Sequence, residues 1–430
     1  MFGTFLLSAS MVAGQGAAPM PLPATSQGPP VVVAPAVPTT APTTIYPEAT
    51  YTFPEAAAEE GAPAPTKYFV QSLLEDKLLG EGYKNSGFNI YGWTQLSYTF
   101  SSARRSNLPT ALNDRADQFQ MNQNYLVLEK HVDTSKDEFQ LGFQTDFILP
   151  GTDARYTLPR GLWNDQLRRG PNGGPQQYPI DMYQFFAEAF LPGVGPNGTV
   201  VKVGRFSTHC GYETVQAVTT PFLPRSYLFQ YNPFTHTGVY ATTQLNDTWS
   251  VGNGLVLGSD NFIDPANRLT YIGQLKWAPK GGSDSLTLNT VITDPSFDVA
   301  EAFPFYNVYD MVWTHAFNDN LTGVVNATYS HIRNVPGIGA TDWYGVAGYL
   351  AWKHNDCFTS NFRAEYFEDT DGFRTGFAGA YQEYTYGLTY TPADWLLIRP
   401  FARFDYNSDS RPFEGERDLY TGGIDLIIRW

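Results

Sequence analysis

Cysteine, positive charge and long apolar runs are all scarce in this chain of 430 residues. Its two cysteines, Cys210 and Cys357, are too few for a disulfide framework or a structural zinc site. Lys and Arg number 27 against 42 Asp and Glu, a formal net charge of −15 that argues against nucleic-acid binding. Beyond the N-terminus there is no run of about 18 apolar residues, which excludes an α-helical membrane protein.

Aromatic residues are abundant, with 27 Tyr, 30 Phe and 9 Trp, whereas charged residues make up only 16% of the chain. The 39 Gly and 31 Pro add many potential turns. A helical bundle does not have this composition. A chain of this length forms either two or three soluble domains or one large β architecture.

The N-terminal region divides into three expected segments. Residues 1–18 contain the apolar run Phe5–Val12 followed by small residues, as in a secretory signal peptide, although no Lys or Arg precedes the run. A misassigned start and a disordered apolar tail are the alternatives. Residues 19–66 form a Pro/Ala-rich periplasmic linker that cannot bury a core and is expected to be disordered. Residues 67–84 predict a short amphipathic helix.

Residues 85–430 show segments of about ten residues with period-two patterning, the length of a tilted transmembrane strand. The clearest places Leu396, Ile398 and Phe404 on one face and Arg399 and Arg403 on the other. A soluble β-sandwich has the same alternation, so this pattern alone does not separate the two folds.

The connections between these segments alternate between short and long, which predicts about sixteen antiparallel strands with all short turns at one end. Eight longer loops, among them Ser207–Thr235 and Asn334–Thr341, separate the short turns. The short turns are expected at Asp133–Asp137, Gly193–Gly198, Asn246–Asp247, Pro279–Asp284, Asn318–Asn320, His354–Asp356 and Pro392–Asp394. A propeller or sandwich has no reason to keep its short turns at one end.

Aromatic residues gather beside the short turns, as in the girdle at the lipid interface of a membrane barrel. The set comprises Phe190, Trp249, Trp277, Trp313, Phe317, Trp352, Phe358, Tyr390 and Trp395. Aromatics beside hairpins also pack soluble β cores, which is the alternative. The fold class is therefore all-β, a transmembrane antiparallel β-barrel.

Several segments together resemble bacterial porins of the outer-membrane-protein-L-like family. They include VKVGRFSTHCGYE (Val201–Glu213), PFTHTGVYATTQLNDTWSV (Pro233–Val251) and YTYGLTYTPADWLLIRPFARFDY (Tyr384–Tyr406). The resemblance runs from about Gly80 to Trp430 and implies an outer-membrane location, a third outer loop (Ser207–Thr235) folded into the lumen, and a homo-oligomer, commonly a trimer. It also implies that Trp430 is a terminal signal for the barrel-assembly machinery.

Strand parity identifies polar side chains that should line the pore. They are Asp146, Glu188, Lys202, Arg205, Lys276, Arg363, Glu365, Glu383, Arg399, Arg403 and Asp425. Lys202 and Arg205 have conflicting parity unless Gly204 marks a bulge. The constriction candidates in and beside the inner loop are His209, Glu213, Arg225 and His236. Lumen charges filter solutes, or they merely hydrate the wall and pair across strands.

No enzymatic motif, cofactor or metal site is expected, because the six histidines lack ligand spacing and no nucleophile elbow or phosphate loop occurs. The favoured function is a porin with a water-filled channel for passive diffusion of small hydrophilic solutes and ions, narrowed by Ser207–Thr235. The alternative is a barrel with a structural, adhesive or cell-wall-tethering role. Expected partners are outer-membrane lipid, the assembly machinery, the solutes and, through the linker, the cell wall.

Overall fold

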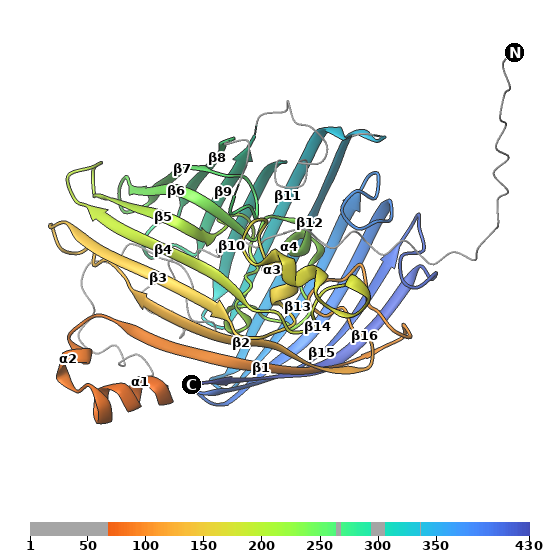
Figure 1. Cartoon of the computed structure of the whole chain (residues 1–430), viewed down its shortest axis with the longest axis horizontal. Coiled ribbons are helices and arrows are strands. Elements are labelled where there is room, and N and C mark those ends of the chain that lie inside the picture. The colour runs from red at the N-terminus through yellow and green to blue at the C-terminus, as the bar shows by residue number, and fades with distance from the viewer. Residues whose placement is uncertain (1–67, 264–267, 294–305, 336) are drawn as a thin grey trace, which may run out of the picture.

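The computed structural model describes residues 68–263, 268–293, 306–335 and 337–430. Sixteen antiparallel strands form a closed barrel in which each strand pairs with the next and β16 pairs with β1 (Figure 1). The expected strand number and the all-β class are therefore confirmed. The signal peptide (1–18) and the Pro/Ala linker (19–66) lie outside the described residues.

The strands cover most of the chain after Phe88. Their bounds are β1 Asn89–Ser101, β2 Gln118–Lys130, β3 Gln140–Ile148, β4 Asp181–Leu191, β5 Thr199–Ser207, β6 Thr235–Gln244, β7 Trp249–Val256, β8 Thr270–Trp277, β9 Asp284–Ile292, β10 Asn307–Asn318, β11 Leu321–Val335, β12 Gly339–Asn355, β13 Phe358–Asp369, β14 Gly379–Ala393, β15 Leu396–Asn407 and β16 Asp418–Arg429.

The helices are short and lie outside the strands. They are α1 Phe69–Leu73, the π-helical η1 Leu74–Leu78, α2 Glu81–Lys84, α3 Ala154–Thr157, η2 Asn164–Arg168, η3 Pro171–Gly173, η4 Ala217–Thr219 and α4 Tyr227–Tyr231. In the part of the chain that the structure describes, none of them has the length and apolar character needed to cross a membrane.

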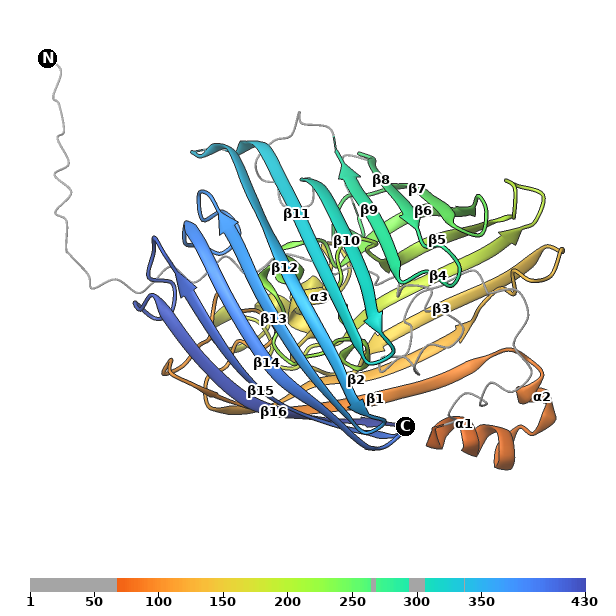
Figure 2. The same ribbon diagram turned by 180° about the vertical axis from the view of Figure 1, so that it is seen from behind.

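The seven short turns are found where the sequence predicts them, and one long loop is shorter than expected. Strands β11 and β12 extend to Val335 and from Gly339, so only residues 336–338 join them instead of Asn334–Thr341. The β-branched residues before Pro336 favour the extended conformation. The strand pairing therefore continues beyond Asn334, where the turn-forming residues predict the loop to begin. The two strands are 15 and 17 residues long, and their hairpin reaches the upper edge of the barrel in Figure 2.

The outer wall carries apolar side chains and the inner wall carries polar ones, as the alternation predicts. On β14, Tyr384 and Tyr386 are 46% and 50% exposed, whereas the alternating Glu383 and Thr385 are completely buried. Charge is costly in lipid, so this outer surface explains the low charge and high aromatic content.

Most aromatics beside the short turns stand on the outer wall. Trp313, Phe317 and Trp352 are 41%, 55% and 56% exposed. Phe190 differs, because it is buried in a small cluster with Val132 and Val200. It has the parity of the inward-facing Glu188 and therefore belongs to the interior, not to the girdle.

The barrel closes where β1 meets β16. Trp430 continues this ladder, since its backbone nitrogen donates to Gly92 O at 2.9 Å and its indole Nε1 donates to Thr94 Oγ1 at 3.2 Å. The N-terminal helical segment docks beside this seam, where Arg429 Nη1 donates to Tyr68 Oη at 2.9 Å (Figure 1). The short N-terminal helix is thus confirmed.

Candidate functional site

The segment between β5 and β6, residues 208–234, lies inside the barrel. Gly211 N donates to Asp310 Oδ1 of β10 at 2.7 Å, and Val215 O accepts a hydrogen bond from Gln123 Nε2 of β2 at 2.6 Å. Strands β10 and β2 are far apart around the closed sheet. A segment that starts at β5 reaches both through the interior.

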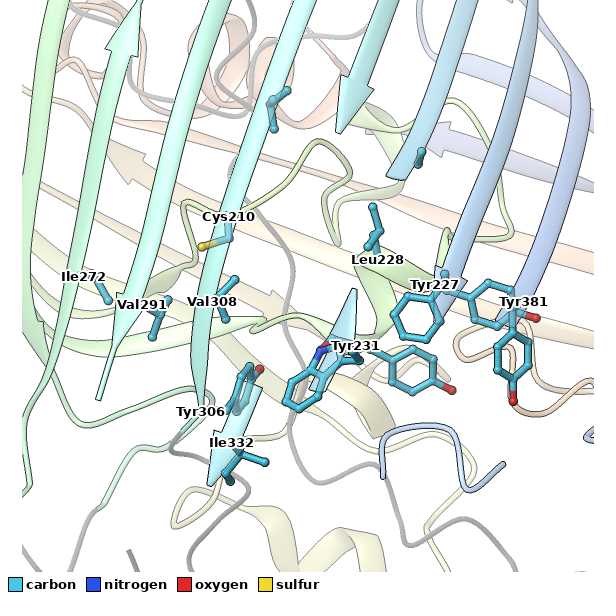
Figure 3. Packing of buried hydrophobic residues seen from close by; sticks show 14 of the residues in the cluster. Cys210, Tyr227, Leu228, Tyr231, Ile272, Val291, Tyr306, Val308, Ile332 and Tyr381 are labelled. Atoms are coloured by element: carbon cyan, nitrogen blue, oxygen red, sulfur yellow. The ribbon is translucent and has the colours of Figure 1, made fainter. Parts of the chain in front are cut away.

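Aromatic packing fixes the same segment against the wall. Figure 3 shows Tyr227 and Tyr231 of α4 gathered with Tyr381 of β14, while Cys210 lies over Val291 and Val308. The rings of Tyr227 and Tyr381 are 4.9 Å apart. Cys210 is buried here and Cys357 is exposed at a short turn, and both thiols are free.

Arginines of β13 and β15 hold the loop from the wall. Arg363 Nη1 donates to Glu213 Oε1 at 2.5 Å and to Pro224 O at 3.1 Å. The same guanidinium donates through Nε to Glu383 Oε2 of β14 at 2.9 Å. An arginine has five donors in a planar fork, so one side chain can bind the wall and the loop together.

Two further arginines repeat this arrangement. Arg399 pairs with Asp425 of β16 and donates to Thr220 O at 2.5 Å. Arg403 pairs with Asp405 and donates to Arg225 O at 2.6 Å. We name Arg363, Arg399 and Arg403 the arginine clamp. All three are buried in the barrel interior and covered by the loop.

Glu365 of β13 binds the start of α4. Its two carboxylate oxygens accept hydrogen bonds from Tyr227 N and Leu228 N, both at 2.7 Å. Ser226 caps the helix by accepting from Phe229 N at 3.1 Å. Ser226 N itself donates to Glu213 Oε2 at 3.1 Å, so all four N–H groups that lack an intrahelical partner at this helix start are satisfied.

The predicted polar residues of β3 and β4 are also covered. Asp146 accepts from Tyr125 Oη at 2.8 Å and Gln184 Nε2 at 2.7 Å. Glu188 accepts from Val132 N at 2.9 Å and lies 3.1 Å from His131 Nδ1.

Gly204 does not mark a bulge on β5, where the sequence gives Lys202 and Arg205 conflicting parity. The ladders of β5 with β4 and β6 keep their register through Gly204, which has a φ of +139°. Lys202 is half-buried with its Nζ 4.5 Å from the Phe186 ring centre. Arg205 is completely buried, with Nη1 2.7 Å from Asp181 Oδ1 and Nη2 2.6 Å from Thr157 O. Lys276 is half-buried on β8.

The constriction candidates have different roles. His209 Nε2 donates to Gly273 O at 3.0 Å, and burial lowers the pKa of His209 to about 3. Arg225 donates to Phe222 O at 2.5 Å inside the loop, and burial lowers its pKa to about 10. Glu213 accepts from Arg363. His236 belongs to β6 and donates from Nδ1 to Gly258 O at 2.9 Å.

The first two long loops also contribute to the interior, which the sequence does not indicate. Arg155 of α3 pairs with Asp114 of the β1–β2 loop at 2.7 Å. Asp153 Oδ2 accepts from Gln123 Nε2 at 2.8 Å, and burial raises the pKa of Asp153 to about 6. These residues belong to irregular segments without periodicity, so no pattern predicts that they face inward.

Within the described ranges, no group of three or more His, Cys, Asp or Glu side chains is arranged to hold a metal ion. The interior polar groups bind one another, the loop backbone and the wall. The arrangement is that of a polar lumen with a fixed internal loop.

Comparisons with known proteins match this geometry. The family model described as "Putative beta-barrel porin-2, OmpL-like" matches residues 87–430. The outer membrane channel DcaP of Acinetobacter baumannii has a TM-score of 0.54 at 10% sequence identity, with 80% of this chain and 97% of that chain covered. The anion-selective porin from Comamonas acidovorans has a TM-score of 0.50 at 8% identity, with 80% and 99% covered. The comparison with curated proteins finds no match.

At these identities the solved structures show the fold, whereas the family model covers nearly the whole barrel. The match begins at residue 87, two residues before β1, and ends at the last residue of the chain. The closed sixteen-stranded sheet, the apolar outer wall and the polar interior agree with it. The chain therefore belongs to the OmpL-like β-barrel porin-2 family and is an outer-membrane porin.

Proposed function

We propose that the barrel lets small hydrophilic solutes and ions diffuse passively across the outer membrane, through a water-filled lumen narrowed by Ser207–Thr235. The arginine clamp is the observation that carries this proposal. A loop held only at its two ends swings, whereas this loop is tied to the wall by a buried ion pair and by hydrogen bonds. A fixed loop gives a constriction of constant size, as a passive channel needs.

Replacing the loop tests this function. Ser207 and Thr235 are paired residues at the end of the β5–β6 ladder, so a two-residue Asn-Gly turn can join the strands in place of residues 208–234. In planar lipid bilayers the parent should conduct, and the loop-replaced barrel should conduct several-fold more. In liposome-swelling assays, the loop-replaced barrel should let larger sugars through than the parent does.

The parent and the variant are first matched for folding by heat-dependent gel mobility, because a closed barrel migrates differently before and after boiling. Absence of any conductance in the parent would contradict the channel. Equal conductance in the two proteins would contradict the role of the loop.

Three partners belong to the same proposal. Trp430 serves as the recognition signal for the barrel-assembly machinery, supported by its place at the last position of the closing strand pair. The linker 19–66 attaches the barrel to the cell wall, and the barrel forms a homo-oligomer.

A further inference from the structure

The outer wall has a depression of about 540 Å³ over β13 to β16 and β1. One transverse row of paired residues runs through it. Phe362 of β13 pairs with Tyr386 of β14, and Tyr386 pairs with Ala402 of β15. Ala402 pairs with Gly422 of β16, which in turn pairs with Phe100 of β1.

Side-chain size along this row creates the depression. The third and fourth of its five positions are Ala402, whose side chain ends at Cβ, and Gly422, which has no side chain. Phe362 and Tyr386 stand on one side, 39% and 50% exposed, and Phe100 stands on the other, 63% exposed. The result is a slot with an apolar floor between aromatic walls.

Two further rings, those of Phe404 and Tyr420, bound the slot at the end nearer the long loops. Phe404 and Tyr420 belong to the next outward row, and their ring centres are 4.8 Å apart. Phe100 is the residue before the last of β1, and Gly422 lies in the half of β16 that follows the last long loop. The slot is therefore in the half of the wall that spans the outer leaflet.

The row faces away from the lumen. The alternating neighbours Arg403 and Thr421 are buried in the interior, so Ala402 and Gly422 point outward. The slot is continuous with the apolar wall that an outer-membrane barrel presents to lipid. Its outward row carries no charge, and its one central hydroxyl, Tyr386 Oη, is 3.3 Å from Ser360 Oγ of the neighbouring strand.

We propose that this slot binds one acyl chain of an outer-leaflet lipid. An acyl chain is apolar, narrow and flexible, so it can follow a slot between rings and gain dispersion contacts that a smooth wall does not offer. Continuity with the lipid-facing wall favours lipid over a second copy of the chain, which needs a broad complementary surface.

The chain provides a matched pair of glycines for the test. A Cβ added at Gly422 would be 3.5 Å from Phe401 O, and one added at Gly348, on the outer face of β12, would be 4.0 Å from Ala364 O. Neither glycine is among the positive-φ residues, so both accept a side chain without backbone strain. Gly422→Trp fills the slot, whereas Gly348→Trp adds the same group to the wall elsewhere. Ala402→Phe fills the slot from the neighbouring strand.

Each protein is reconstituted in vesicles of palmitoyl-oleoyl phosphatidylglycerol, extracted in mild detergent and examined by native mass spectrometry. The parent and Gly348→Trp should retain one lipid per chain. Gly422→Trp and Ala402→Phe should lower the lipid-bound fraction at least tenfold, with unchanged heat-dependent gel mobility and conductance.

Loss of the lipid in both slot variants but not in Gly348→Trp supports the site. A parent without retained lipid, or equal retention in all four proteins, overturns it. Dissociation of an oligomer by the slot variants with the lipid still bound also overturns it, since the slot is then a contact between copies.

Discussion

At the scale of single residues, the charged side chains of the lumen act as ties. Sequence parity predicts that Arg363, Arg399 and Arg403 line the pore, and the structure buries all three beneath the loop. Their second role depends on residues far away in the chain, because each also donates to a backbone carbonyl of the loop. Each of these three arginines is paired with a carboxylate. They therefore fit the alternative in which charges of the lumen pair with one another instead of lining an open path.

Arg363→Met should loosen the loop. The change leaves Glu213 buried without its ion-pair partner and leaves Glu383 with only Arg403, whose Nε is 3.7 Å from Glu383 Oε1. Breaking a buried ion pair in this way costs about 3–5 kcal/mol. We expect a lower thermal unfolding temperature and noisier, larger single-channel currents. Arg411→Met is the control, because Arg411 and its partner Glu416 are exposed and exposed pairs contribute little. Currents identical to the parent would contradict the clamp.

His209 should make the loop sensitive to acid. The pKa of this imidazole is about 3 in the folded chain against an ordinary value of 6.5. The unfolded loop therefore binds a proton first, so the stability from neutral His209 is complete above pH 6.5 and is lost as the pH falls toward 3. The hydrogen-exchange protection factors of the loop peptides, which correct for the pH dependence of intrinsic exchange, should fall over this range in the parent and less in His209→Gln.

Two other groups affect the interpretation of this experiment. The His236 ring lies 5.9 Å from that of His209, and a second positive charge there would add repulsion. Asp153 has the opposite effect on stability. Its pKa is higher in the folded chain than in the unfolded chain, so protonation of Asp153 stabilises the folded state as the pH falls. Variant and parent are therefore compared at each pH, with His354→Gln at a short turn as the control. An equal fall in the protection factors of His209→Gln would contradict the assignment.

At the scale of elements, the pairing of β1 with β16 is the step that closes the sheet, and both ends of it are reinforced. At the short-turn end, the Trp430 ring covers Gly92, where an added Cβ would come within 2.4 Å of the indole. At the long-loop end, the Glu414 carboxylate accepts hydrogen bonds from the backbone of Arg104, Arg105 and Ser106. These contacts join segments about three hundred residues apart in the chain.

Trp430→Ala should reduce the amount of folded barrel in the outer membrane several-fold, because it removes both the proposed assembly signal and the packing over Gly92. Trp395→Ala is the matched control, since Trp395 is a half-exposed aromatic at a short turn of the same end. The measurement is the fraction with heat-dependent mobility in isolated membranes. Equal losses in the two variants would point to a general need for interfacial aromatics.

At the scale of the whole molecule, the interior is acidic. The buried residues of the described ranges include 14 Asp and Glu but 7 Arg and no Lys. The net charge of −15 is a poorer guide to ion selectivity than the interior charge, because it includes Glu48, Glu55, Glu59 and Glu60 of the linker. We expect a modest cation preference, read from the reversal potential in a salt gradient. Anion selectivity, as in the name of the Comamonas acidovorans porin, would contradict it.

Deleting residues 19–66 should separate conduction from attachment. The described barrel closes through β1 and β16, and its N-terminal helical segment binds Arg429 through Tyr68, which the deletion keeps. Bilayer conductance should equal that of the parent, while co-sedimentation with isolated cell wall should fall. Loss of conductance would show that the linker contributes to the channel.

The fold and the orientation of the wall could be predicted because they depend on local patterns. A two-residue period places Arg399 inward and Ile398 outward wherever the strand pairs, and turn residues mark most strand ends. The prediction failed where a side chain was assigned to the lipid interface only because it lies beside a turn. Phe190 flanks a turn but faces inward. Asp114 and Arg155 meet only because two loops enter the lumen.

The sequence by itself determined a β-barrel in a membrane, its strand number and the polarity of its two faces, because lipid and water act on each residue separately. Tertiary structure decided what the interior charges do. Whether Arg363 meets water or Glu213 depends on the path of a loop 150 residues away in the chain. That path is set by closure of the sheet, which brings β2, β10 and β13 around one loop, and no local pattern contains it.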